Sequence, residues 1–308
     1  MFDIPLPGPE KFVWPVFVVE GRKRREAISS MPGQYRLSTD MLLKELSRVT
    51  NEGIGGILVF GVAKEGKKNN AGSMAFSEKG TVQTAIRAIK HEFPELVTCT
   101  DVCLCAYTNH GHCGPLDHKG NVDNDKANQM LARTAVSHAE AGADCVAPSA
   151  MMDGQVITIR KALDKAGFNQ TVLISYSTKF ASAMYGPFRD AENSTPGKGD
   201  RKGYQASYGN IRQALLESQL DEAEGADILM VKPSLFYLDI LGKLREQTKL
   251  PIAAYNVSGE YSMLIAAADR GWGELKAMVR ESTTAICRAG ADIIISYWAN
   301  RYKEIFKI

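Results

Sequence analysis

The chain has 308 residues, with 37 Lys and Arg against 35 Asp and Glu, a formal net charge of +2 and a hydrophobic content of 44%. This composition is ordinary for a globular protein and gives no reason to expect nucleic acid as a partner. No apolar run reaches the ~18 residues of a membrane span, and the proline-rich N-terminus lacks the apolar core of a signal peptide. Six cysteines in a chain of this length do not make a disulfide scaffold, so we expect a reducing, cytoplasmic compartment.

Short apolar runs alternate with segments of helical periodicity along the chain. A short N-terminal arm, residues 1–11, precedes strands expected at about residues 13–19, 55–62, 97–104, 144–149, 171–177, 227–232, 251–257 and 291–297. Helices are expected between them, for example at residues 39–52, 125–141 and 208–224. This alternation predicts an α/β protein with parallel strands joined by right-handed crossovers. Eight such units favour a TIM (β/α)8 barrel over an open doubly wound sheet, and no interior linker divides residues 1–308, so we expect a single domain.

One local pattern occurs three times, at residues 140–149, 224–232 and 288–296. Each copy reads as a helix end, a glycine and a short apolar run. Glycine closes helices in the left-handed conformation, and a continuous apolar run fits a strand buried on both faces. The repeat therefore supports the barrel. A Gly-rich phosphate fingerprint is missing after the first strand, which argues against a dinucleotide-binding fold.

Cys103, Cys105 and Cys113 lie within eleven positions of one another, with His110 and His112 between them. Thiolate sulfur is a strong ligand for zinc, and three thiolates without a clear fourth ligand suggest a catalytic site with an open position. Two alternatives remain from the spacing alone. One of the histidines would close a structural zinc site, or the cysteines are simply buried as small hydrophobic residues.

Two lysines end predicted strands, Lys179 after an apolar run at residues 171–177 and Lys232 after residues 227–231. Active-site groups of a (β/α)8 barrel lie at the C-terminal ends of its strands, so both lysines should share one face with the cysteine cluster. A buried lysine close to another cation has a lowered pKa, and its neutral amine can form a Schiff base. The alternative is that each lysine is a structural ion-pair partner. The same strand ends also carry Asp101, Ser149, Ser258 and Tyr297.

A loop rich in Gly, Pro and charge follows Lys179, and residues 189–205 are expected to form an active-site lid. Its cationic side chains would suit a substrate that bears a carboxylate. The alternative for this segment is an exposed, disordered loop.

Four segments together resemble the porphobilinogen synthase family, also called 5-aminolevulinate dehydratase, in its zinc-binding, cysteine-rich branch. They are DVCLCAYTNHGHCG (101–114), SYSTKFASAMYGPFRDA (175–191), MVKPSLFYLDI (230–240) and YNVSGEY (255–261). The resemblance runs from about residue 12 to residue 297. It implies a TIM barrel that condenses two molecules of 5-aminolevulinate to porphobilinogen, with loss of two waters, in tetrapyrrole and haem biosynthesis.

The resemblance also implies a role for each matching residue. Lys232 matches the family lysine that forms a Schiff base with the first substrate, and Lys179 matches the second active-site lysine. The three cysteines match ligands of a catalytic zinc. Other matching positions are substrate contacts: Asp101 and Ser149 beside the second substrate, Arg189, Arg201 and Gln205 on its carboxylate, and Ser258 and Tyr297 on the carboxylate of the first.

Several features depart from the family or extend its pattern. Ala150 stands where many relatives have Asp, so a carboxylate role at that position is lost. The family usually forms octamers through a longer N-terminal arm, so this chain is expected to be a homo-oligomer whose octameric state is in question. Glu217 occupies the neighbourhood where some members of the family bind an activating, allosteric magnesium ion. The alternative is that Glu217 is an ordinary solvated carboxylate on a helix.

Two other functions are open from sequence. A Schiff-base aldolase would share the barrel and Lys232, but it would not explain the thiolate cluster or Lys179. A non-catalytic zinc-binding or interaction protein on a degenerate barrel would not need both lysines and all three cysteines. The order of carbon–carbon and carbon–nitrogen bond formation does not follow from sequence.

Overall fold

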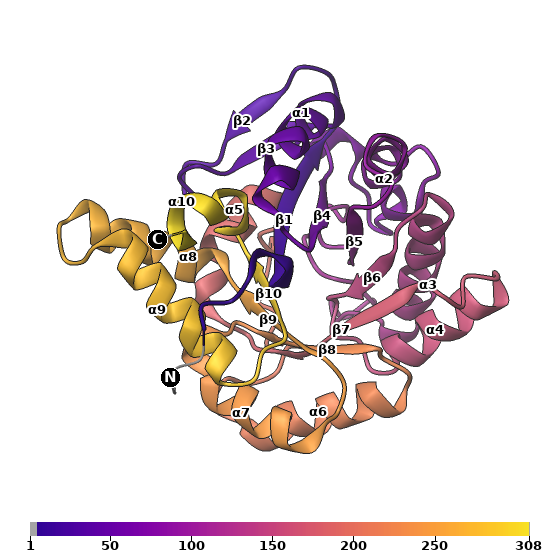
Figure 1. The fold of residues 1–308 in the computed structure, drawn as a ribbon. Helices are drawn as coiled ribbons and strands as arrows, with labels where there is room; N and C mark the ends of the chain where they lie inside the picture. Colours follow the sequence, from indigo (N-terminus) through magenta and orange to yellow (C-terminus); the bar gives the residue numbers. More distant parts are fainter. Residues whose placement is uncertain (1–4, 308) are drawn as a thin grey trace.

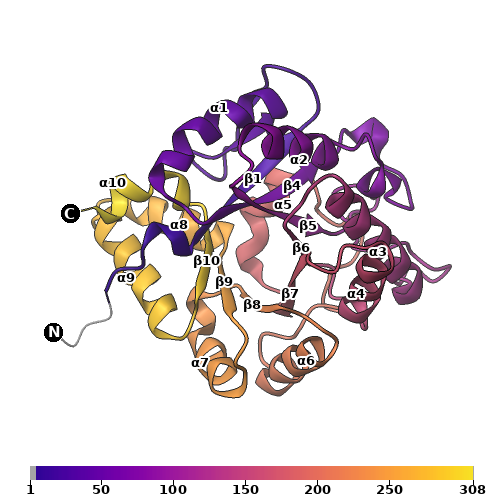
Figure 2. The same cartoon turned by 45° about the vertical axis from the view of Figure 1, so that its right-hand side comes forward.

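The eight apolar runs form eight parallel strands that close into a barrel in a computed structural model, which describes residues 5–307 (Figures 1 and 2). The strands are β1 (Phe12–Val19), β4 (Gly56–Val62), β5 (Val97–Val102), β6 (Cys145–Pro148), β7 (Val172–Lys179), β8 (Ile228–Lys232), β9 (Ile252–Asn256) and β10 (Ile293–Ser296). Each pairs with the next along the chain, and β10 pairs with β1 to close the ring. The predicted (β/α)8 barrel is confirmed.

Helices surround this ring (Figure 2). They are α1 (Thr39–Val49), α2 (Thr81–Glu92), α3 (Asn124–Glu140), α4 (Gln155–Lys165), α5 (Gly186–Glu192), α6 (Ile211–Ala223), α7 (Leu238–Gln247), α8 (Ser258–Asp269), α9 (Leu275–Arg288) and α10 (Tyr302–Phe306). Short 3-10 turns add η1 (Pro9–Lys11), η2 (Thr50–Glu52), η3 (Glu65–Lys67), η4 (Ser73–Phe76), η5 (Ala183–Tyr185), η6 (Leu235–Tyr237) and η7 (Ala299–Arg301). None of the helices within residues 5–307 is long and apolar enough to cross a membrane.

The repeated glycines behave as the sequence predicted. Gly142, Gly225 and Gly290 follow the ends of α3, α6 and α9 with φ of 103°, 101° and 117°. Such φ values are strained for residues with a Cβ, so glycine lets the chain leave each helix and enter the next strand.

Two short strands were missed by the sequence analysis. β3 (Tyr35–Ser38) adds in parallel to the C-terminal part of β1, and β2 (Arg25–Ala27) pairs with β3 in the antiparallel sense. They form a ribbon beside α1 in Figure 1. Most of β2 is exposed, so it lacks the apolar run that identifies a buried strand.

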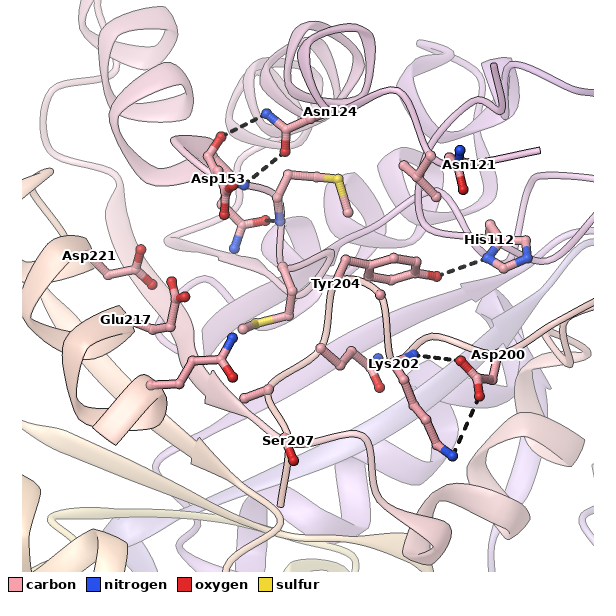
Figure 3. A pocket seen from close by; sticks show the side chains of 18 of the residues that line it. His112, Asn121, Asn124, Asp153, Asp200, Lys202, Tyr204, Ser207, Glu217 and Asp221 are labelled. Carbon is pink, nitrogen blue, oxygen red and sulfur yellow. Dashed lines mark hydrogen bonds and ion pairs between the residues drawn. The ribbon is translucent and has the colours of Figure 1, made fainter. Parts of the chain in front are cut away.

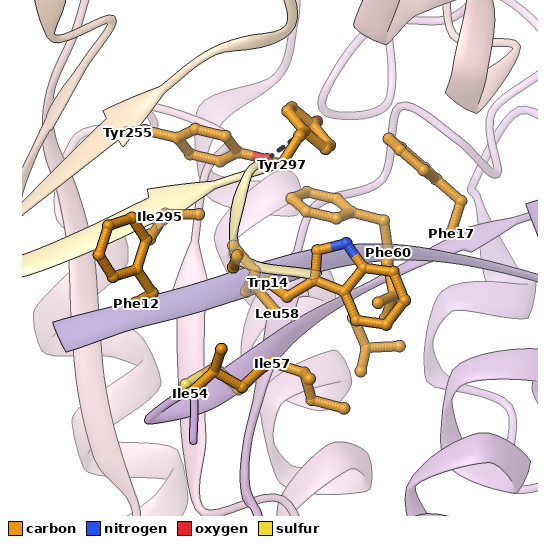
Figure 4. Packing of buried hydrophobic residues seen from close by; sticks show 14 of the residues in the cluster. Phe12, Trp14, Phe17, Ile54, Ile57, Leu58, Phe60, Tyr255, Ile295 and Tyr297 are labelled. Atoms are coloured by element: carbon orange, nitrogen blue, oxygen red, sulfur yellow. Dashed lines mark hydrogen bonds between the residues drawn. The ribbon is translucent and has the colours of Figure 1, made fainter. Parts of the chain in front are cut away.

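The barrel interior is apolar at the N-terminal ends of its strands. Val13, Leu58 and Ile295 of β1, β4 and β10 line this interior, and Figure 4 shows Leu58 and Ile295 among the buried side chains. Phe12 points the other way and packs against Tyr302 and Phe306 of α10. A small apolar cavity of about 150 Å³ lies at this end, lined in part by Cys99 and Cys145, which are register partners on β5 and β6. Because this end is filled by hydrocarbon, the buried polar groups collect at the opposite, C-terminal end.

Candidate active site

The strand ends bring the predicted polar residues to one end of the barrel. Lys179 and Lys232 are the last residues of β7 and β8, and they are direct register partners. Asp101 lies near the end of β5, and Ser149 comes directly after β6. Ser258 and Tyr297 come just after β9 and β10. Six residues that are far apart in sequence therefore lie at the same end of the barrel.

Aromatic rings enclose the amine of Lys232. Its Nζ lies 4.0 Å from the ring centre of Tyr255, 4.8 Å from Phe188, 5.1 Å from Tyr176 and 5.4 Å from Tyr185. We call these four side chains the aromatic cage. Burial and the charge of Lys179 together lower the pKa of Lys232 to about 7. A substantial fraction of the amine is therefore neutral and nucleophilic near pH 7.

Lys179 lies beside this cage and is also buried, with 5% of its surface exposed. Its Nζ donates a hydrogen bond to the carbonyl oxygen of Ser149, and it lies 5.5 Å from the ring centre of Tyr176. Both lysines thus approach the ring of Tyr176. The predicted repulsion between them is confirmed for Lys232, and neither lysine is in an ion pair within 4.0 Å in the described part of the chain.

Cys103, Cys105 and Cys113 come together on the turns after β5. Their Sγ atoms all lie within 4.8 Å of one another, and the Sγ atoms of Cys103 and Cys105 are 3.3 Å apart. All three cysteines are buried and unpaired. Hydrogen bonds from Cys103 and Cys105 hold the pKa of Cys113 well below its usual value. The pKa of Cys103 and that of Cys105 are raised, so Cys113 is the thiol of the cluster that ionises first. Three buried sulfurs this close together form a donor set that suits zinc.

The strand that precedes this cluster is shorter than the sequence predicted. β5 ends at Val102 rather than near residue 104, so the two-cysteine pair lies in a turn and not at an extended strand end. The amide of Tyr107 donates to the carbonyl of Leu104 within that turn. The turn brings both sulfurs to the same side, which an extended Cys-x-Cys segment would also do.

The two histidines lie outside the cysteine cluster. The Nε2–H of His112 donates to the carbonyl of Lys198 at 3.0 Å, and its Nδ1 accepts from the hydroxyl of Tyr204 at 3.1 Å. His110 lies 3.4 Å from the carbonyl of Asn70 through its Nε2. Because both ring nitrogens of His112 are engaged elsewhere, the structure does not favour a closed site with histidine as fourth ligand.

The segment 189–205 starts in α5 and carries several buried polar side chains. Arg201 is 4% exposed, and its Nη2 donates to the carbonyls of Gly111 and Ser194 at 2.9 and 2.6 Å. Several buried polar atoms here have no hydrogen-bond partner within the described residues: the Nε atoms of Arg189 and Arg201, both amide atoms of Gln205, and Oδ1 of Asp101. Unpaired buried polar groups are costly, so these atoms indicate a place that takes a polar ligand.

Ser258 and Tyr297 lie against the other side of the aromatic cage. The Ser258 hydroxyl accepts from the amide of Phe188 at 2.9 Å. The hydroxyls of Tyr297 and Tyr255 are 3.2 Å apart. Figure 4 marks this hydrogen bond by a dashed line. Both residues are thus one contact away from the Lys232 amine.

The sequence analysis missed Glu192 and the aromatic cage. Glu192 is 2% exposed, and its Oε2 lies 3.4 Å from the Sγ of Cys105. Burial and the charge of Glu192 together raise the pKa of Asp101 to about 7. No sequence signal separates Glu192 from the exposed charged residues around it. Tyr176 and Tyr255 carry a faint signal, because each is an aromatic residue near the end of a barrel strand.

Glu217 lies away from the lysines and cysteines. It lines a cavity of about 580 Å³ with Asp153, Asp221 and Tyr204 (Figure 3). Burial raises the pKa of Glu217, and the charges of Asp153 and Glu224 raise it further. Within residues 5–307, these carboxylates do not converge as closely as the three sulfurs do.

Comparison with known proteins gives one consistent family. A family model described as "Delta-aminolevulinic acid dehydratase" matches residues 7–305. The enzyme of that name from Synechococcus elongatus is 52% identical over 291 residues, which cover 94% of this chain and 89% of the relative. The Toxoplasma gondii enzyme, solved in complex with the reaction product porphobilinogen, has a TM-score of 0.95 and 42% identity over 97% of this chain and 86% of its own.

A solved aldolase also shares the fold, with a TM-score of 0.52 and 12% identity over 99% of this chain and 96% of its own. At that identity the likeness reflects the barrel alone.

Proposed function

Since the chain belongs to the delta-aminolevulinic acid dehydratase family and condenses two molecules of 5-aminolevulinate to porphobilinogen, we propose that Lys232 and Lys179 are its catalytic residues. The observation that supports this best is the register pairing of two buried lysines, one of which has a pKa of about 7.

Lys232 is the proposed nucleophile toward the first substrate. Its neutral amine attacks the ketone carbon, the carbonyl oxygen leaves as water, and a carbon–nitrogen double bond forms. The aromatic cage excludes water from this bond. Once the imine nitrogen is protonated, the faces of the surrounding rings stabilise the cation. Lys179 is proposed to hold the second substrate within reach of the first. Two substrates held in this way react as a positioned pair, which lowers the entropic part of the barrier by several kcal/mol.

Cys103, Cys105 and Cys113 are the proposed ligands of a catalytic zinc, because three buried sulfurs within 4.8 Å fit that ion. When bound, zinc would supply Lewis-acid polarisation of a carbonyl or a lowered pKa for water. Asp101 and Ser149 are proposed to contact the second substrate on the same side of the site. Their proximity to Lys179 and the cysteines supports this assignment.

The carboxylate tails of the substrates need donors, and the site has two groups of them. We assign Arg189, Arg201 and Gln205 to the second substrate, because each carries a buried polar atom without a partner in the described residues. Ser258 and Tyr297 are assigned to the first, beside the cage. Residues 189–205 are accordingly proposed as a lid over the active site. Arg201→Lys tests the role of Arg201 in substrate binding, and a raised KM with a smaller change in kcat is expected.

The pH dependence of imine formation follows from Lys232. Its amine faces Lys179, whose charge lowers the pKa, and Asp101, Glu192 and Cys105, whose charges raise it. The neutral amine is the reactive form, so the rate of imine formation is expected to rise with pH and level off above about pH 7, falling about tenfold per unit below it. Mass spectrometry of borohydride-quenched samples over a pH series measures this rate. A flat profile across that range would contradict the assignment.

Glu217 is proposed to bind an activating magnesium ion. Magnesium keeps several waters and uses one or two carboxylates, so Glu217 in a roomy, acidic cavity fits a hydrated ion. Added Mg²⁺ is expected to raise the activity of zinc-loaded enzyme severalfold, and Glu217→Gln to remove this response while keeping basal activity. Titration of activity with Mg²⁺ measures it, with Glu222→Gln on the same helix as control. An unchanged response in Glu217→Gln would refute the site.

Assembly and compartment are proposed as follows. The chain is a homo-oligomer, and its octameric state is in question because the described part of the arm folds back on its own barrel: the carbonyl of Pro7 accepts from the Tyr302 hydroxyl at 2.8 Å. Residues 1–4 of the arm lie outside the described residues. Light scattering over a concentration series would establish the assembly.

Six unpaired cysteines support a reducing, cytoplasmic compartment, which cell fractionation would test.

One assay separates this function from its rivals. Enzyme supplied with zinc and reductant should convert 5-aminolevulinate to a pyrrole that reacts with Ehrlich's reagent. An aldolase or a non-catalytic zinc-binding protein would form none.

A further inference from the structure

Glu192 is a buried carboxylate that lies beside the cysteine cluster. It is the last residue of α5, and Asn193 with φ of 51° ends that helix and turns the chain away. The side chain is 2% exposed, and its Oε2 is 3.4 Å from the Sγ of Cys105. The carboxylate therefore points into the protein, toward the cluster.

This carboxylate forms no salt bridge in the described part of the chain, although the charges of Arg201 and Lys179 act on it from farther away. Within residues 5–307, no Lys, Arg or His nitrogen lies within 4.0 Å of Glu192. Its hydrogen-bonding contact is the thiol of Cys105, which is a weak donor. Burying a charged carboxylate costs several kcal/mol unless it is paired or coordinates a metal. A divalent ion at the cysteines would supply the missing positive charge.

The distance between Glu192 and Cys105 fits two ligands of one metal ion. In a tetrahedral zinc site, bonds of ~2.3 Å to sulfur and ~2.0 Å to oxygen place the two ligand atoms ~3.5 Å apart. The observed separation between Cys105 Sγ and Glu192 Oε2 is 3.4 Å. Only the three sulfurs form a set with all members within 4.8 Å, so the carboxylate lies at the edge of the cluster, and coordination of a central ion requires its side chain to move toward the other two sulfurs.

We propose that Glu192 is the fourth ligand of the metal held by Cys103, Cys105 and Cys113 in the substrate-free enzyme. This inference rests on the proposed metal site at the three cysteines. A metal that acts on substrate needs an open position, so Glu192 must leave when the substrate enters. Arg189, one helical turn earlier on α5, carries an unpaired donor for the substrate's carboxylate. Substrate binding at α5 and release of the fourth ligand are thereby linked through one short helix.

Metal binding by Glu192→Gln tests this ligand without relying on activity. Glutamine has the same shape but no charge, so zinc affinity, measured by competition with a chromophoric chelator, is expected to fall at least about 10-fold. In cobalt-substituted enzyme, the sulfur-to-cobalt charge-transfer bands should persist while the d–d bands change, because one oxygen ligand is altered. Asp190→Asn is the matched control. Asp190 lies on the same helix but bonds Ser30 through its carboxylate, so both readouts should stay as in the wild type.

The outcomes separate this inference from the metal site itself. Unchanged zinc affinity and unchanged d–d bands in Glu192→Gln would overturn it. Weaker affinity with unchanged d–d bands would overturn it as well, because Glu192 would then act outside the coordination shell. Cys113→Ser is measured in parallel. If that variant keeps the wild-type cobalt spectrum, the metal does not lie at the cysteines, and both proposals fail. Circular dichroism of each variant establishes that it is folded.

Discussion

Lys232→Met is expected to abolish the covalent adduct that borohydride traps with 5-aminolevulinate, and to lower kcat by on the order of 10⁴-fold or more. Lys232 is the amine with a pKa of about 7, and it lies at the centre of the aromatic cage. Methionine has a similar length and an apolar side chain that suits this cage, so the fold should be retained. Intact-protein and peptide mass spectrometry measure the adduct, and Ehrlich's reagent measures turnover.

Two other lysines serve as controls for that experiment. Lys179→Met should still form the adduct at Lys232, but more slowly at neutral pH, because removing the neighbouring charge raises the pKa of Lys232. It should also lose turnover, since the second substrate is no longer held. Lys243→Met, at an exposed position on α7, should behave as the wild type. An adduct that persists unchanged in Lys232→Met would refute the assignment.

Thermal unfolding distinguishes a chemical role for Lys232 from a structural one. A buried lysine is costly to charge and has no ion-pair partner within 4.0 Å in the described residues. Replacing it by methionine should therefore leave the melting temperature equal or higher. If Lys232 instead stabilised the fold, Lys232→Met would lose activity together with melting temperature.

Sequence reasoning predicted the barrel well because its strands are buried on both faces. A continuous apolar run is then the direct consequence of the fold, and each predicted strand lies within a few residues of an observed one. The placement of Lys179 and Lys232 followed from the same rule, since side chains at the C-terminal ends of barrel strands meet. The edge ribbon of β2 and β3 escaped prediction, because an exposed strand lacks that apolar run.

The parts of the site that sequence could not reveal depend on tertiary packing. The aromatic cage combines side chains from β7, β9 and the segment around α5, and nothing in one sequence links those positions. Glu192 occurs in a stretch of Asp, Asn and Lys that reads as solvated, yet the chain folds it against Cys105. Burial of a polar residue in a charged loop is set by what covers it, and only the structure shows that cover.

Cys113→Ser is expected to lose zinc and to lower the rate of pyrrole formation at least about 100-fold. Three sulfurs within 4.8 Å form the proposed site, and a serine hydroxyl does not ionise to replace a thiolate near neutral pH. Metal analysis after gel filtration in metal-free buffer gives the zinc content per chain. Cys287→Ser, on α9 and outside the cluster, should keep both zinc and activity.

Chelation of the wild-type enzyme gives the complementary test. Removing zinc should suppress pyrrole formation, and adding zinc back should restore it. Reductant has to be present throughout, because the Sγ atoms of Cys103 and Cys105 are 3.3 Å apart and oxidise readily once no metal protects them. Adduct formation at Lys232 should survive chelation, since the first imine needs only a neutral amine. Full turnover by enzyme stripped of zinc would remove the metal from the mechanism and leave the buried thiols as a packing feature.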